Sequence, residues 1–110
     1  MSKYFLEPSG RGYKELAEGA RTRTFWGAQM LFSLVEVEAG ALVPLHTHPH
    51  EQGGIIVEGE LEMGIGGEVR VLKPGDMYII PGDVEHYAKG QETKAIALDI
   101  FSPVREEFKY

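Results

Sequence analysis

The chain has 110 residues, and its 17 acidic and 11 basic side chains give it a net charge of −6. This length allows one domain with a single core, and the acidic balance argues against binding to the phosphate backbone of nucleic acids. The absence of cysteine excludes disulfide bonds and thiolate metal sites. No apolar run approaches the roughly 18 residues of a membrane helix, and the first residues lack an apolar signal segment, so we expect a cytoplasmic protein without membrane contacts.

The N-terminal residues 1–20 show no clear pattern, and we expect them to pack on the main domain or on a dimer partner. From residue 21 onward, strand signals recur at roughly eight- to twelve-residue spacing, with no convincing interior helix and no repeat. The clearest predicted strands cover residues 29–38, 58–65, 69–72, 77–80 and 94–101. Glycine and Pro-Gly-Asp sequences predict turns at residues 66–67, 73–76 and 81–83. The pattern predicts one all-β barrel or jelly roll over residues 21–110.

All four histidines fall in two short segments, residues 40–59 and 75–86. His46 and His48 are two residues apart, so in an extended segment both imidazoles project to one face. Imidazole is the commonest protein ligand for divalent transition metals. His46, His48 and His86 are therefore predicted to form a metal site. The donor types alone do not choose among Fe, Mn, Ni, Zn and Cu.

Two neighbours of these histidines are expected to play lesser roles. His50 follows Pro49, which bends a strand and removes a ladder donor, so we expect His50 to support the site or to lie on the surface. Glu51 has the opposite parity to His46 and His48 and is expected to face outward.

The second informative segment is the predicted strand 94–101, which carries Asp99 between apolar neighbours on both faces. This pattern predicts a strand that is buried on both sides, with Asp99 on the same face as Ala97 and Phe101. A buried carboxylate is costly unless it is paired, protonated or near a cation. Inside a barrel that holds a metal, Asp99 is expected to act as a general acid/base. A hydrogen-bonded structural aspartate is the alternative.

The histidine segments resemble the two sequence motifs of the cupin superfamily, G-x5-H-x-H-x3/4-E-x6-G and G-x5-P-x-G-x2-H-x3-N. The matching positions are Gly40, His46, His48, Gly59, Gly75, Pro81 and His86. Three positions depart from the motifs: Gln52 stands where the family usually has Glu, Asp83 replaces Gly, and Gly90 replaces Asn.

This resemblance implies a cupin double-stranded β-helix, or jelly-roll, barrel. It also implies one divalent transition metal ion held by His46, His48, Gln52 and His86, with Gln52 binding through its amide oxygen. Small cupins pair through sheet edges, so we expect a homodimer.

The C-terminal segment resembles the tail of KdgF-type cupins of pectin and alginate breakdown, D-x-F-S-P-x-R-x-[DE]-[FY]. The matching positions are Asp99, Phe101, Ser102, Pro103, Arg105 and Phe108. This resemblance implies an enzyme that opens and ketonises 4,5-unsaturated uronate monosaccharides, with Asp99, Phe101 and Arg105 lining the active site. Arg105 would grip the carboxylate of an anionic sugar, Phe101 would stack on the ring, and Asp99 would move the proton. A solvated position in the tail is the alternative for Arg105.

Two other classes of function remain open from the sequence. The chain could be another small-molecule cupin enzyme, such as a dioxygenase or a sugar isomerase, or a non-catalytic metal- or sugar-binding domain. A free acid/base in the barrel, Asp99, favours the enzymes over a binding domain.

Overall fold

The computed structural model describes residue 2 and residues 4–110. The ten strands of this part of the chain are β1 (Lys14–Ala17), β2 (Ala20–Trp26), β3 (Leu31–Val37), β4 (Leu42–His46), β5 (Glu51–Glu58), β6 (Leu61–Ile65), β7 (Glu68–Leu72), β8 (Met77–Ile80), β9 (His86–Gly90) and β10 (Ala95–Ser102). Two short 3₁₀ helices, η1 (Pro8–Gly10) and η2 (Glu106–Phe108), lie near the two ends. No helix in the described residues is long and apolar enough to cross a membrane.

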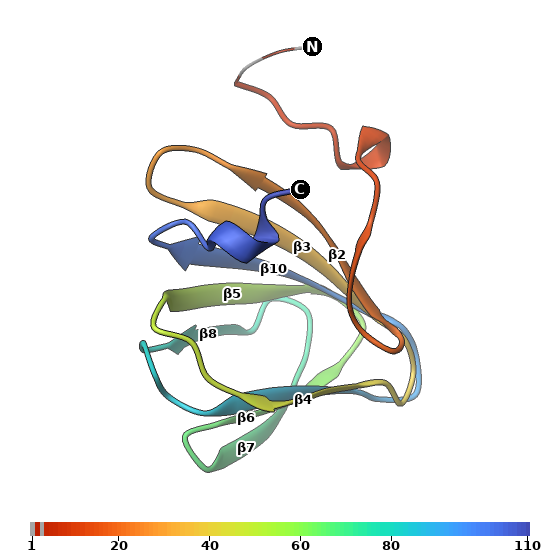
Figure 1. Cartoon of the computed structure of the whole chain (residues 1–110). Coiled ribbons are helices and arrows are strands. Elements are labelled where there is room, and N and C mark those ends of the chain that lie inside the picture. The colour runs from red at the N-terminus through yellow and green to blue at the C-terminus, as the bar shows by residue number, and fades with distance from the viewer. Residues whose placement is uncertain (1, 3) are drawn as a thin grey trace.

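The strands form two antiparallel sheets that face one another, as Figure 1 shows. The larger sheet has the order β1-β2-β3-β10-β5-β8, and the smaller has the order β4-β9-β6-β7. Strands that are distant in sequence are neighbours, which is the arrangement of a jelly roll. The all-β barrel predicted from the sequence is confirmed, and its core lies between the sheets.

Side chains alternate between the two faces of each strand, and the face that carries the apolar side chains is the buried one. In β6, Leu61 and Met63 are buried, as the sequence predicts. However, the predicted strand 58–65 is broken at Gly59, which adopts a positive φ of 72° and separates β5 from β6. The expectation that the segment 94–101 is buried on both faces is also wrong, because Ile100 on the outer face of β10 is 38% exposed.

One row of side chains crosses the larger sheet on its inner face. The strand registers place Tyr78, Gly54, Asp99, Ser33 and Thr24 side by side on β8, β5, β10, β3 and β2. Gly54 has no side chain, and the other four residues of the row are buried and each carries a hydroxyl or carboxyl group. The row therefore places hydrogen-bonding groups inside the barrel, beside the apolar core cluster.

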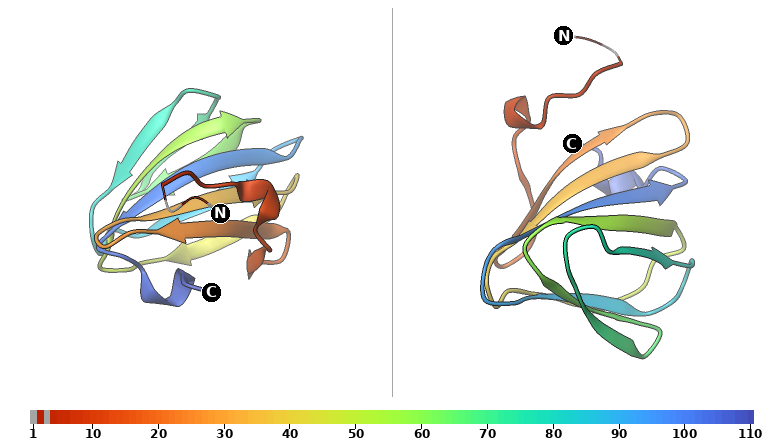
Figure 2. Two further views of the ribbon diagram at one scale, coloured as in Figure 1. Left: turned by 90° about the horizontal axis from the view of Figure 1, so that it is seen from above. Right: turned by 180° about the vertical axis from the view of Figure 1, so that it is seen from behind.

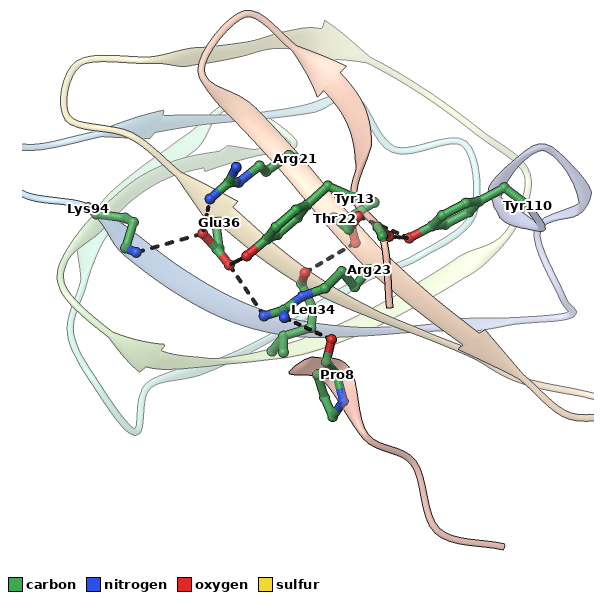
Figure 3. Close-up of polar contacts among 10 residues, drawn as sticks. Pro8, Tyr13, Arg21, Thr22, Arg23, Leu34, Glu36, Lys94 and Tyr110 are labelled. Carbon is green, nitrogen blue, oxygen red and sulfur yellow. Dashed lines mark hydrogen bonds and ion pairs between the residues drawn. The ribbon is translucent and has the colours of Figure 1, made fainter. Parts of the chain in front are cut away.

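The N-terminal segment, from Pro8 to Ala17, lies over the outer face of the larger sheet on its β2–β3 side (Figures 1 and 2), and residues 1 and 3 lie outside the described residues. Figure 3 shows the contacts that hold it there. Tyr13 donates a hydrogen bond from its hydroxyl to the buried Glu36 carboxylate at 2.8 Å, and Arg23 donates one to the Pro8 carbonyl at 2.8 Å. At the edge of the same sheet, β1 pairs with β2. This segment is thus tied to the barrel by polar contacts as well as by a strand.

Candidate metal centre

Three histidine rings meet at the end of the barrel where β4 ends and β9 begins. His46 and His86 are register partners on these two strands, and their ring centroids are 4.2 Å apart. His48 lies in the connection between β4 and β5, with its ring 4.8 Å from that of His86. One ligand atom from each ring lies within 4.8 Å of the others. The structure therefore brings together the three histidines that the sequence predicts as ligands, and they could hold one metal ion.

Each ring is oriented by a backbone carbonyl. The Nδ1 atoms lie 2.7 Å from the Pro44 oxygen for His46, 3.0 Å from the His50 oxygen for His48, and 2.9 Å from the Val84 oxygen for His86. A carbonyl oxygen only accepts, so each Nδ1 carries the proton and each Nε2 keeps a free lone pair. Nε2 of His86 is buried without a partner among the described residues. This is the arrangement in which a protein fixes the tautomer of a metal-binding histidine.

Burial keeps two of these rings neutral. It lowers the pKa of His86 to about 4 and is also the largest cause that lowers the pKa of His48. The positive charge of Arg105 acts in the same direction on both rings. Because metals bind the unprotonated imidazole, these rings are ready to coordinate at neutral pH.

Gln52, on β5, supplies an oxygen at the same place. Its Oε1 lies 3.0 Å from Nε2 of His48, and its amide also interacts with the Asp99 carboxyl. An amide that donates through nitrogen to Asp99 turns its oxygen toward His48, where Nε2 is itself an acceptor. Two facing acceptors repel one another unless a cation lies between them. The donor set thus fits a divalent transition metal bound by three imidazoles, with the Gln52 amide oxygen available as a fourth ligand.

Two loops hold the halves of this centre against each other. The Asp83 backbone N–H donates to the His48 carbonyl at 2.8 Å, so the turn before β9 is bonded to the His48 segment. A Cβ atom on Gly82 would lie 2.4 Å from the Pro49 oxygen, so only glycine allows this approach. Asp83 has a positive φ of 67°, a conformation that aspartate tolerates better than most residues. The replacement of the motif's glycine by aspartate therefore leaves the turn intact.

Asp99 is buried and lines the same cavity inside the barrel as His46 and His86. Burial raises its pKa to about 6, while the hydrogen bonds from Tyr78 and Gln52 act in the opposite direction. The Tyr78 hydroxyl donates to Oδ1 of Asp99. Burial, and then the Asp99 charge, raise the pKa of Tyr78, so its hydroxyl keeps its proton. The carboxyl is thus polarised by two donors and close to the predicted ligand Gln52.

Phe101, near the end of β10, and Arg105, in the segment after it, also lie near the histidines. Phe101 is buried with its ring 5.5 Å from that of His48, in an edge contact. The Arg105 guanidinium carbon lies 4.1 Å from the Phe108 ring and 5.2 Å from the Phe101 ring. Nε of Arg105 donates to Glu107 at 2.6 Å. Arg105 is therefore packed between aromatic rings near the histidines rather than solvated in a free tail.

A sequence model of the cupin domain matches residues 33–101 of the chain. The chain belongs to the cupin family. Over 110 residues, this cupin is 30% identical to the pectin degradation protein KdgF of Dickeya dadantii, with 98% of this chain and 99% of that protein covered. Two solved structures are similar along nearly the whole chain. One is an RmlC-like cupin from Shewanella frigidimarina, with a TM-score of 0.89, 29% identity and coverage of 97% of this chain and 96% of that one. The other is KdgF from Halomonas sp., with a TM-score of 0.87, 28% identity and coverage of 94% and 96%.

In this cupin the lesser histidine neighbours lie as predicted. Glu51 is exposed, and His50 lies outside the cluster of three histidines while its carbonyl orients His48. Sequence reasoning missed Tyr78, which the parity of β8 places on the inner face, and Glu107, which pairs with Arg105. The charge pattern of the tail could have suggested the Arg105–Glu107 pair. Only the pairing of β5 with β8 and β10 shows that Tyr78 meets Asp99.

Proposed function

We propose that this cupin opens 4,5-unsaturated uronate monosaccharides from pectin or alginate breakdown and converts them to the linear keto form. The observation that carries the proposal is a buried carboxyl, Asp99, that lies next to a three-histidine centre with an arginine, Arg105, packed beside it. The similarity to pectin degradation protein KdgF along nearly the whole chain supports the same substrate class.

The reaction is an isomerisation, so it needs no second substrate. The anomeric hydroxyl loses a proton, the ring C–O bond breaks to give an aldehyde and an enolate, and the enolate becomes a ketone when a carbon of the former double bond gains a proton. A divalent metal held by His46, His48, His86 and Gln52 would supply a Lewis acid for the oxygen atoms of the sugar. Asp99 can accept the first proton and return it to carbon, because burial raises its pKa to about 6, close to neutrality.

Arg105 provides the recognition of the uronate carboxylate. A guanidinium can bind a carboxylate through two parallel hydrogen bonds, which fixes both position and orientation. Its present partner, Glu107, is exposed, so substrate would replace a solvent-facing ion pair. The cavity inside the barrel has a volume of about 70 Å³ and is lined by His46, His86, Gln52 and Asp99 among others, so the predicted ligands and the carboxyl face one space.

The test uses the ultraviolet absorbance of the unsaturated uronate, which decays as the double bond is lost. Purified protein loaded in turn with each candidate metal should accelerate this decay above the spontaneous rate, and proton NMR should identify the linear keto product. His86→Ala protein, which lacks one ligand, is the control. Decay at the spontaneous rate with every metal would exclude the uronate reaction. Undiminished sugar binding in that case would point to the non-catalytic alternative.

We also propose that the chain forms a homodimer through the outer face of β8, β5 and β10. Glu51 faces outward at the start of β5. The other outward-facing side chains of this surface are apolar: Ile55, Val57, Met77, Ile79, Ile96, Leu98 and Ile100. Met77 and Ile79 project from the edge strand and are 74% and 67% exposed, while Gly53 leaves a hollow beside them. A face with both projections and a hollow can fit a second copy of itself across a two-fold axis. Chains with a net charge of −6 repel one another, so a mainly apolar face favours self-association there.

Sedimentation equilibrium tests this pairing. The wild type should have about twice the chain mass of 12.2 kDa, and Ile79→Asp should have the chain mass. Val69→Asp introduces the same charge at a comparably exposed apolar position on β7, in the other sheet, and should stay dimeric. A monomeric wild type, or a dimeric Ile79→Asp protein, would contradict the proposed interface.

A further inference from the structure

We propose that Tyr78 is a positioning residue for Asp99, holding the carboxyl in the orientation that the ring-opening reaction needs. This inference rests on the proposed function and adds to it a residue on β8, a strand that carries none of the predicted ligands. Its basis is the hydrogen bond from the Tyr78 hydroxyl to Oδ1 of Asp99, made in the interior of the barrel.

The contact spans three strands and depends on a glycine between the two side chains. Gly54 of β5 is the register partner of both Tyr78 on β8 and Asp99 on β10. Neighbouring strands are about 4.8 Å apart, so residues on β8 and β10 are separated by roughly twice that distance. A Cβ atom on Gly54 would lie 2.3 Å from both Cζ and Oη of Tyr78 and 2.4 Å from Oδ1 of Asp99. The tyrosine reaches the carboxyl only because residue 54 has no side chain.

Burial makes this hydrogen bond important for orientation. Tyr78 and Asp99 are both buried, and Gln52 is the other donor identified for the carboxyl. A carboxyl held by donors from two directions has a fixed torsion, whereas one with a single donor can rotate. Gln52 is itself a predicted metal ligand, so Tyr78 is the donor that orients Asp99 independently of the metal. A general acid/base works only when its oxygen faces the proton that it transfers.

Tyr78→Phe tests the role, because it keeps the ring and removes only the hydroxyl. We expect kcat for the unsaturated uronate to fall about 10- to 100-fold, the range for loss of a hydrogen bond to a charged group. KM and bound metal should not change, since Arg105 and the histidines are untouched. Gly54→Ala should lower kcat in the same way, because its methyl group occupies the path between tyrosine and carboxyl while both groups remain present.

Tyr87→Phe is a matched control. The Tyr87 hydroxyl donates to the Glu62 carboxylate at 2.8 Å, and its ring lies over Gly64 just as Tyr78 lies over Gly54. Loss of that hydrogen bond should leave kcat unchanged. If Tyr78→Phe retains the wild-type kcat, or if Tyr87→Phe lowers kcat equally, the positioning role is wrong while the proposed function stands. A wild-type protein that does not accelerate decay overturns the proposed function, and the positioning role with it.

Discussion

The buried carboxylate of Glu36 offers a sharp test of how the outer face of the barrel is stabilised. Its two oxygens face a hydrogen-bond donor and three cations: Tyr13 at 2.8 Å, Arg21 at 3.2 Å, Arg23 at 3.3 Å and Lys94 at 3.7 Å (Figure 3). Burial alone would raise the pKa of Glu36, but the hydrogen bonds from Tyr13 and Arg21 and the charges of Arg21 and Lys94 outweigh it and lower the pKa. Glu36→Gln removes the charge and keeps the shape.

The expected loss of stability follows from the exposure of each partner. Breaking a buried ion pair costs about 3–5 kcal/mol. Arg21 and Lys94 are 46% and 42% exposed, so water screens most of the contribution that their ion pairs with Glu36 make to the free energy of unfolding. Arg23 is only 16% exposed, so its ion pair is screened less. Glutamine also retains one oxygen that can accept from Tyr13. We therefore expect Glu36→Gln to lower the free energy of unfolding by about 2 kcal/mol, or Tm by about 8 °C for a domain of this size.

The lowered pKa of Glu36 determines how the stability difference between wild type and Glu36→Gln changes with pH. Because the pKa of Glu36 is lowered in the folded chain, the unfolded chain binds its proton more readily, and the stabilisation is complete above the unfolded pKa of about 4.3. It is lost as pH falls through the folded pKa. In urea unfolding, the difference between wild type and Glu36→Gln should therefore shrink below about pH 4. Glu60→Gln, an exposed control, should behave as the wild type. A difference that is below about 0.5 kcal/mol at neutral pH, or that does not depend on pH, would refute this reasoning.

Four further predictions concern the metal centre and the reaction. His86→Ala should reduce bound metal from about one ion per chain to near zero by elemental analysis, with the far-ultraviolet circular dichroism retained. Gly82→Ala should weaken metal binding at least about tenfold in a chelator competition, because its Cβ would lie 2.4 Å from the Pro49 oxygen; unchanged affinity would show that this contact does not set the histidine geometry. Asp99→Asn should lower kcat about 10²- to 10⁴-fold without changing metal content, whereas Arg105→Ala should chiefly raise KM; equal kcat for Asp99→Asn would exclude it as the acid/base.

The parts of the site that depend on local spacing could be predicted from the sequence. His46 and His48 share a face because they are two residues apart, and the inward direction of Asp99 follows from the parity of its strand. Turn glycines were equally informative, except at Gly59, where a regular alternation of apolar and acidic residues concealed a break between two strands. Alternation identifies the buried face of a strand but does not identify where that strand ends.

Contacts between strands that are distant in sequence could not be predicted in the same way. Tyr78 and Asp99 are 21 residues apart, and they meet because both pair with one residue of β5. The N-terminal segment gave no clear sequence signal, because it is held by the pairing of the short strand β1 with β2 and by single polar contacts such as the bond from Arg23 to the Pro8 carbonyl. Such contacts follow from strand order and register, which a single sequence determines only weakly.

Gly82 and Gly54 have the same physical role in this site, because at each of them the missing side chain allows a close approach between two other groups. At Gly82 the missing side chain lets one loop approach the carbonyl of another, which brings the segments of His48 and His86 together. At Gly54 it lets a tyrosine reach across a strand to the carboxyl of Asp99. In both cases the predicted ligand or the proposed acid/base is an ordinary residue in a regular strand or loop, and its position is set by a neighbour that has no side chain. Substitutions at these glycines should therefore alter metal binding or turnover although neither residue can take part in the chemistry.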